Sequence, residues 1–161
     1  MESPKTGTGR VIIVGSDGSP QSDAALRWAF TVGAQRADTV RAITVYPRDE
    51  LLPGTSFALQ PRGRMPHAEQ AITPAEHIAA LRAETPGAPE VETVEAAGDP
   101  ATQLVSATTD ADLLVIGAHQ HSVVGDLLLG SVSRECVRYA HCPVVVITPE
   151  AANRLNPASV G

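Results

Sequence analysis

The sequence has little of several features that mark common classes of protein. Its 12 Lys and Arg residues are outnumbered by 18 Asp and Glu residues, which gives a formal net charge of -6. Because basic side chains hold a phosphate backbone, this balance disfavours DNA or RNA as a partner. No apolar run approaches the roughly 18 residues that a membrane span needs. The polar segment from Met1 to Arg10 lacks the apolar core of a secretory signal. We therefore expect a cytoplasmic protein.

Catalytic and redox signatures are also missing. The sequence contains no Gly-x-Ser-x-Gly elbow, no Walker A lysine and no Gly-x-Gly-x-x-Gly fingerprint after its first apolar run. Its two cysteines, Cys136 and Cys142, lie too far apart for a Cys-x-x-Cys motif, and no further cysteines complete a zinc site. We interpret both as partly buried thiols in a reducing compartment, with a disulfide or a redox switch as the alternative. An enzyme is not expected.

Five short apolar runs alternate with segments of helical pattern. The runs predict strands at Val11–Val14, Val40–Tyr46, Glu90–Glu95, Leu113–Ile116 and Val144–Ile147. Most of these runs are apolar throughout, as expected of strands that are buried on both faces. The third run interleaves acidic residues, which favours a sheet edge. Strands separated by helices predict a parallel α/β sheet.

Three predicted helices begin with a capping residue followed by proline. These pairs are Ser19-Pro20, Thr73-Pro74 and Asp99-Pro100, and the second predicts a helix from about Pro74 to Glu84. One face of the first helix is predicted to consist of Ala25, Trp28, Ala29 and Val32. One face of the last helix is predicted to consist of Val132, Cys136, Val137 and Ala140.

Two glycine-containing loops follow predicted strands. Gly15-Ser16-Asp17-Gly18 follows the first strand, and the Gly117 loop follows the fourth and ends at Gly130-Ser131. In parallel sheets, ligands bind beyond the carboxyl ends of the strands. A loop that ends at a helix N-terminus also presents N–H groups that suit phosphate. We therefore expect the two loops to share one site.

These motifs resemble those of a known family. The loop at Val14–Ser19, the series Gly117, Gln120 and Gly130-Ser131, and the Cys142–Val146 strand together resemble the universal stress protein family. The resemblance extends over about Arg10 to Thr148, and Leu127–Ser133 is its most specific part. It implies one domain at residues 10–148, with residues 1–9 and 149–161 as flexible termini.

The resemblance implies a particular fold and assembly. The fold is a three-layer α/β/α sandwich whose five-stranded parallel sheet has the order 3-2-1-4-5. This arrangement is Rossmann-like and of the adenine nucleotide alpha hydrolase-like type. It places Val144–Ile147 at a sheet edge, where an uncovered apolar strand invites aggregation. We expect that strand to pair with its copy in a homodimer.

In one branch of the family, the pattern Gly-x2-Gly-x9-Gly-Ser/Thr holds ATP. Carried over to this chain, Gly117, Gly130, Ser131 and Ser133 would contact the phosphates and ribose. Asp17 would lie near the ribose or a phosphate-bound Mg²⁺, and the backbone of Val45 would meet adenine. The expected binding residues are Gly15, Ser16, Asp17, Val45, Ile116, Gly117, Gln120, Gly130, Ser131, Val132 and Ser133, with Asp17 also the metal ligand.

Gln120 departs from this pattern because it occupies the position of the second glycine. If the turn needs a positive φ, the substitution costs about 1 kcal/mol of strain, whereas its amide can donate to a phosphate oxygen. The leading hypothesis is a stress-response protein that binds ATP or another adenine nucleotide. The alternatives are a nucleotide-free interaction module and a slow ATPase that uses Mg²⁺ at Asp17.

Each candidate residue also has a simpler interpretation. Asp17 fits a turn residue bonded to its own backbone, and Ser131 and Ser133 fit helix caps. The pair His119 and His121, with Asp126 nearby, is weak support for a metal site and fits exposed loop histidines better. The proline-rich segment Pro47–Pro66 predicts an irregular loop that is long enough to be a lid.

Overall fold

The computed structural model describes residues 9–47, 72–118 and 129–157. Its strands form a five-stranded parallel sheet in the order β3-β2-β1-β4-β5, which confirms the expected order. The strands are β1 (Val11–Gly15), β2 (Thr39–Tyr46), β3 (Val91–Ala97), β4 (Leu113–Gly117) and β5 (Val144–Ile147). The acidic third strand and the apolar fifth strand lie at the two edges.

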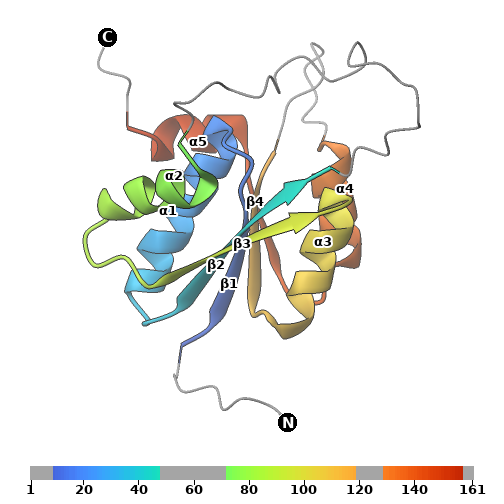
Figure 1. Cartoon of the computed structure of the whole chain (residues 1–161), viewed down its shortest axis with the longest axis horizontal. Helices are drawn as coiled ribbons and strands as arrows, with labels where there is room; N and C mark the ends of the chain where they lie inside the picture. Colours follow the sequence, from blue (N-terminus) through green and yellow to red (C-terminus); the bar gives the residue numbers. More distant parts are fainter. Residues whose placement is uncertain (1–8, 48–71, 119–128, 158–161) are drawn as a thin grey trace.

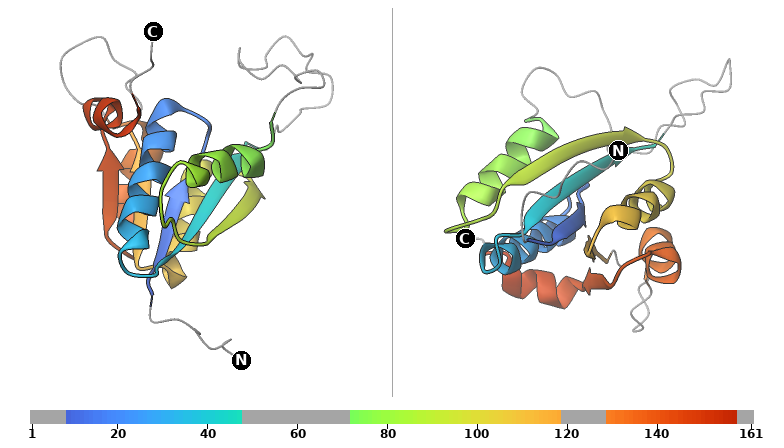
Figure 2. Two further views of the ribbon diagram at one scale, coloured as in Figure 1. Left: turned by 90° about the vertical axis from the view of Figure 1, so that its left-hand side faces the viewer. Right: turned by 90° about the horizontal axis from the view of Figure 1, so that it is seen from below.

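Helices cover both faces of the sheet. The helices are α1 (Pro20–Ala34), α2 (Pro74–Ala83), α3 (Pro100–Ala107), the short 3-10 helix η2 (Thr108–Asp110), α4 (Ser131–Tyr139) and α5 (Pro149–Leu155). In Figure 1, α1, α2 and α5 lie on one side of the sheet and α3 and α4 on the other. Figure 2 shows the same three layers from below. Within the described ranges, no helix is long and apolar enough to cross a membrane.

The predicted cap-and-proline pairs all begin helices. The side chain of Ser19 accepts from the Ser22 N–H at 3.2 Å, and Thr73 forms a reciprocal capping box with Glu76. Asp99 accepts from both the N–H and the hydroxyl of Thr102, and these hydrogen bonds lower the pKa of its carboxyl. Each cap satisfies N–H groups that have no partner inside the helix. Local sequence therefore sets where α1, α2 and α3 begin.

The strand side chains alternate between two apolar cores. Ile12 and Val14 of β1 pack under α1, α2 and α5, whereas Ile13 packs on the α3 and α4 side. All three are fully buried. A central strand must be apolar on both faces because helices cover both, which explains the continuous apolar runs.

The structure corrects two expectations from the sequence. We expected a flexible tail from residue 149, but Pro149–Leu155 forms α5, and Ala152 of that helix is buried in the core. We also placed Val137 on the buried face of α4, but its side chain is 51% exposed. A nine-residue helix at the margin of the sheet buries only a narrow stripe, here Ser133 and Cys136. Trp28 is half-buried against the core, close to its expected place.

An ion pair joins the start of β1 to the start of β2. Arg10 holds the buried carboxylate of Asp38 through its backbone N–H at 2.8 Å and its Nη2 at 2.9 Å. Burial by itself raises the pKa of Asp38. The hydrogen bonds and charge of Arg10 outweigh that effect and hold the pKa below its ordinary value of 3.8.

We expect Asp38→Asn to lower the free energy of unfolding by about 2 kcal/mol at pH 7, because a charge-assisted pair is lost. A carboxyl whose pKa is depressed by folding stabilises the protein above its unfolded pKa and loses that contribution as pH falls through the folded value. The difference between wild type and variant should therefore shrink below about pH 4. Urea titrations from pH 7 to pH 2.5 measure it, and a difference that grows toward acid pH contradicts this role of Asp38.

Candidate nucleotide pocket

A cavity of about 270 Å³ lies at the carboxyl ends of β1, β2 and β4. It is lined by Gly15, Ser16, Asp17, Ser22, Ile43, Val45, Pro47, Pro100, Leu104, Ile116, Gly117, Gly130, Ser131, Val132 and Ser133. Every binding residue expected from the sequence that the structure describes is in this set. Ligands of parallel α/β sheets bind at this edge. The fold thus brings the first glycine-containing loop together with the described ends of the second, Gly117 and Gly130-Ser131, as predicted.

One wall of the cavity is apolar. Ile43 and Val45 come from the end of β2, and Leu104 comes from α3. Ile43 and Leu104 are nearly fully buried and belong to the core on the α3 and α4 side. Sequence reasoning missed both as lining residues. Ile43 was detectable because strand side chains alternate, so it shares a face with Val45. Leu104 was detectable only as part of a helical apolar stripe.

Another wall of the cavity is polar and belongs to the loop between β1 and α1 and to the first turn of α1. Asp17 accepts from the Ser19 N–H at 2.9 Å, and its own N–H donates to the Ser22 hydroxyl at 3.3 Å. That hydroxyl in turn donates to the Ser19 carbonyl at 3.1 Å. Asp17 is therefore a turn residue bonded to its own loop, as its simpler interpretation predicted, and it also lines the cavity.

The N-terminus of α4 faces the cavity without a side-chain cap. Its N-cap residue is Gly130, and no side chain of the described residues caps its first turn. The prediction that Ser131 or Ser133 caps this helix is therefore wrong. Ser133 is instead buried, with its hydroxyl 3.5 Å from the Gly117 carbonyl. Side chains of Ser19 and Asp99 cap α1 and α3, whereas among the described residues no side chain caps α4, so its first N–H groups are the ones beside the cavity that suit an anion.

Gly117 has a structural role of its own. A Cβ at this position would lie 2.6 Å from Cβ and 2.7 Å from the backbone carbonyl carbon of Gln21. The end of β4 thus passes directly against the first turn of α1. Glycine is required there for packing, whether or not a phosphate binds. By contrast, a Cβ at Gly15 would meet mainly the end of the flexible Leu104 side chain, at 3.2 Å.

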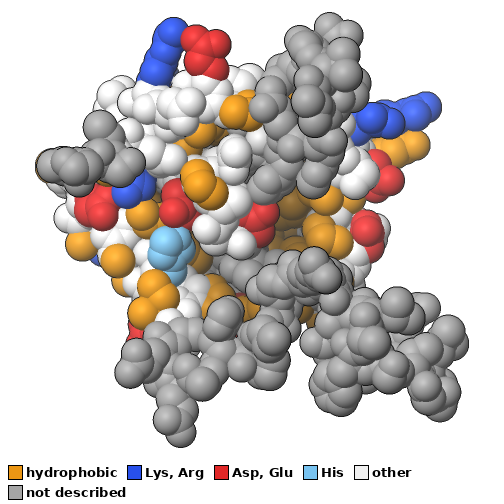
Figure 3. Space-filling view, turned by 90° about the horizontal axis from the view of Figure 1, so that it is seen from above, with side chains coloured by type: hydrophobic (Ala, Val, Ile, Leu, Met, Phe, Trp, Pro, Cys, Tyr) orange, Lys and Arg blue, Asp and Glu red, His pale blue; other side chains and the backbone are white. Residues whose placement is uncertain are grey.

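The described lining of the cavity carries no Lys, Arg or His side chain. In the view onto this edge of the sheet, hydrophobic side chains lie in and beside a hollow, Asp and Glu side chains lie next to them, and Lys and Arg lie toward the rim of the described surface (Figure 3). No cluster of three or more potential metal ligands occurs among the residues that the structure describes. Among the described residues, the groups that could hold a phosphate here are backbone N–H groups and hydroxyls.

Several sequence predictions fall on residues outside the described ranges. Gln120 is one of them, as are the metal candidates His119, His121 and Asp126. The predicted irregular loop Pro47–Pro66 also lies outside them, apart from Pro47, which lines the cavity. The predictions for these residues stay predictions.

Comparison with known proteins gives a consistent result. A model of the universal stress protein family matches residues 9–148 of the chain. Universal stress protein Rv2623 of Mycobacterium tuberculosis is 37% identical over 148 residues, which cover 86% of this chain and 48% of that protein. The chain therefore spans about half the length of the curated relatives it matches.

Solved structures agree with the fold. The crystal structure of a universal stress protein in complex with cAMP is 26% identical, with a TM-score of 0.61, and the match covers 87% of this chain and 97% of that one. The universal stress protein from Archaeoglobus fulgidus in complex with dAMP is 19% identical, with a TM-score of 0.51 and coverage of 86% and 96%. At that lower identity, the likeness shows a shared fold.

Proposed function

Because the chain belongs to the universal stress protein family, we propose that it binds an adenine nucleotide, such as ATP, in the cavity at the carboxyl end of the sheet. The observation that carries the proposal is the N-terminus of α4, which lines the same cavity as an apolar wall and has no side-chain cap among the described residues. An apolar wall suits a base, and the N–H groups at a helix start suit a phosphate.

In this proposal each wall of the cavity holds one part of the nucleotide. Adenine lies against Ile43, Val45 and Leu104, and the backbone of Val45 contacts the edge of the base. The phosphate lies at the first turn of α4, within reach of Ser131 and Ser133. The similar structures with cAMP and dAMP support an adenine nucleotide as the ligand class.

Asp17 would supply one carboxylate ligand to a divalent cation, and the phosphates would supply others. Mg²⁺ is commonly bound through one or two carboxylates together with phosphate oxygens and water, and Asp17 lies in the cavity wall. When bound, the ion would neutralise negative charge of the phosphates, which the described lining does not neutralise because it carries no basic side chain. In the slow-ATPase alternative, phosphate release above background should disappear in Asp17→Ala.

Isothermal titration with ATP and Mg²⁺, and separately with AMP and cAMP, tests the proposal. We expect saturable heat with at least one of the three. No heat with any of them at high micromolar concentration overturns the nucleotide proposal. That result favours the second candidate, a nucleotide-free interaction module, which the half-buried apolar edge strand β5 supports.

The proposed assembly is a homodimer through β5. Val144, Val145 and Val146 are only half-buried at this edge, whereas the other edge strand carries the exposed charges of Glu92 and Glu95. Charged edges resist pairing, and apolar edges invite it. Sedimentation should give a dimer at micromolar concentration, and a stable monomer overturns this assembly. A cytoplasmic stress-response role completes the proposal.

A further inference from the structure

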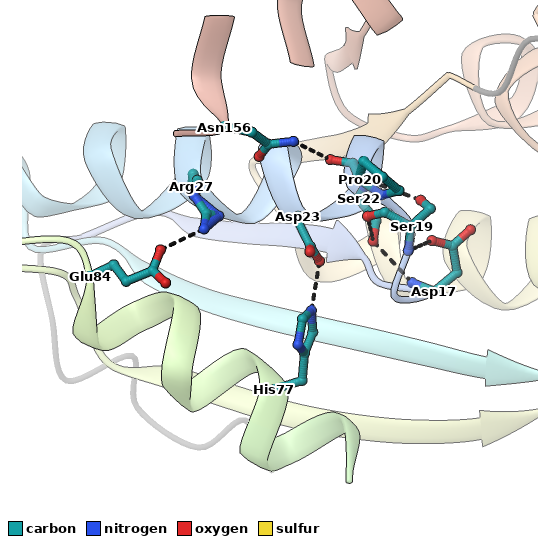
Figure 4. A network of polar contacts seen from close by, with 9 residues as sticks. All are labelled: Asp17, Ser19, Pro20, Ser22, Asp23, Arg27, His77, Glu84 and Asn156. Carbon is teal, nitrogen blue, oxygen red and sulfur yellow. Dashed lines mark hydrogen bonds and ion pairs between the residues drawn. The ribbon is translucent and has the colours of Figure 1, made fainter. Parts of the chain in front are cut away.

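We propose that Asn156, which follows α5, is a positioning residue for the nucleotide cavity because it holds the first turn of α1. The inference rests on the proposed function, since it identifies what fixes one wall of that cavity. The Asn156 side-chain Nδ2 donates to the Pro20 carbonyl at 2.9 Å, although the two residues are 136 positions apart (Figure 4). This contact lies partly beyond residue 148, where the family match ends.

Pro20 adjoins the hydrogen-bonded loop that forms the polar wall. The Ser19 carbonyl accepts from the Ser22 hydroxyl, and the same hydroxyl accepts from the Asp17 N–H. Both Ser22 and Asp17 line the cavity. As Figure 4 shows, Asn156 reaches this cluster from the side opposite to Asp17. A shift of Pro20 therefore moves Ser19 and, through it, the two lining residues.

The helix that precedes Asn156, α5, is itself firmly held. The Thr148 hydroxyl caps α5 by accepting from the Ala151 N–H at 3.2 Å, and Ala152 is buried against the α1 side of the core. At the other end, the Asn156 N–H donates to the Ala152 carbonyl at 2.9 Å. Because its backbone is fixed, Asn156 can hold Pro20 in place instead of following its motion.

The second polar atom of the Asn156 side chain is unfavourable for the stability of the folded protein. Its Oδ1 is buried and has no hydrogen-bond partner in the part of the chain that the structure describes. A buried carbonyl without a partner is unfavourable. The contribution of Asn156 to this region therefore lies in the donor at Nδ2, and a side chain of equal size without that donor should not replace it.

Two further contacts hold α1 against the segment of α2, away from Asn156. His77 of α2 contacts Asp23 of α1 through Nε2 and Oδ1 at 2.8 Å, and Arg27 pairs with Glu84 further along the same two helices. These contacts do not involve α5 (Figure 4). Loss of the Asn156 hydrogen bond should therefore loosen the first turn of α1 locally and leave the fold intact.

The test compares Asn156→Asp, which keeps the size but replaces the donor with a carboxylate oxygen, with Arg154→Ala. Arg154 is a matched control because it lies on α5, is 79% exposed and pairs only with Glu150 among the contacts of the described chain. In the ligand-free chain, amide hydrogen exchange at Asp17, Ser19 and Ser22 should be at least 5-fold faster in Asn156→Asp than in wild type. Exchange in Arg154→Ala should match wild type.

The second readout is nucleotide affinity. Titration with AMP, and with ATP and Mg²⁺, well below the melting temperature should give a 5- to 10-fold higher Kd in Asn156→Asp and an unchanged Kd in Arg154→Ala. Unchanged exchange at the three loop amides overturns the inference, as does equal acceleration across all strands. A wild-type chain that binds neither nucleotide, but shows the local acceleration in the variant, overturns the proposed function and supports the positioning role of Asn156.

Discussion

Replacing Ser131 by aspartate should weaken adenine-nucleotide binding about 30-fold and leave the protein folded. Ser131 is exposed at the first position of α4 and lines the cavity where the phosphate is proposed to bind. Two like charges about 4 Å apart repel by about 1 kcal/mol in water and about 4 kcal/mol near a protein surface. An intermediate value of about 2 kcal/mol corresponds to about 30-fold in Kd. Titration calorimetry measures the change.

The fold should tolerate this change because an acidic side chain at the start of a helix interacts favourably with the helix dipole. Ser131→Asn is the matched control, since it has nearly the size of aspartate without the charge, and its Kd should stay within about 3-fold of wild type. Equal weakening by both variants would mean that size, not phosphate charge, governs this position. Undiminished affinity in Ser131→Asp would place the phosphate elsewhere.

Replacing Gly117 by alanine should lower the free energy of unfolding by about 3 kcal/mol. The new methyl group would lie within 3.0 Å of both side-chain and backbone atoms of Gln21. Overpacking a well-filled site costs about 1–3 kcal/mol, and backbone atoms in the first turn of α1 yield less readily than a side-chain end. Urea denaturation followed by circular dichroism measures the loss.

The control for this variant is Gly15→Ala, because the atoms nearest to the added methyl group belong to the side chains of Leu104 and Ile116. We expect a loss below about 1 kcal/mol there, since a flexible side chain can move by a few tenths of an ångström. If Gly117→Ala is as stable as Gly15→Ala, the close contact between β4 and α1 is not required, and Gly117 is needed only for a ligand.

Much of the fold could be predicted because its signals are local. The cap-and-proline pairs at Ser19, Thr73 and Asp99 each begin a helix where predicted, since a cap acts on N–H groups two or three residues away. The apolar runs mark strands because both faces of the sheet are covered. At Val137, where burial at the margin of the sheet decides, the helical pattern failed. The helix α5 was missed although it begins with the same kind of cap-and-proline pair, Thr148-Pro149.

For the same reason, some residues of the site could be predicted from the sequence and others could not. Residues at strand ends and at the start of α4 were identified because their loops carry a recognisable pattern. Ile43 and Leu104 were missed because they reach the cavity from core positions. Gly117 was assigned a role toward phosphate, whereas the structure shows a packing need that depends on Gln21, a residue from another element.

The sequence by itself determined the strands, the capped helix starts and the edge of the sheet at which a ligand would sit. Each of these follows from interactions between near neighbours or from one family pattern. Only the tertiary structure decided that the end of β4 touches the first turn of α1, and that Asn156 reaches Pro20. Such contacts join distant parts of the chain, so no local pattern of residues encodes them.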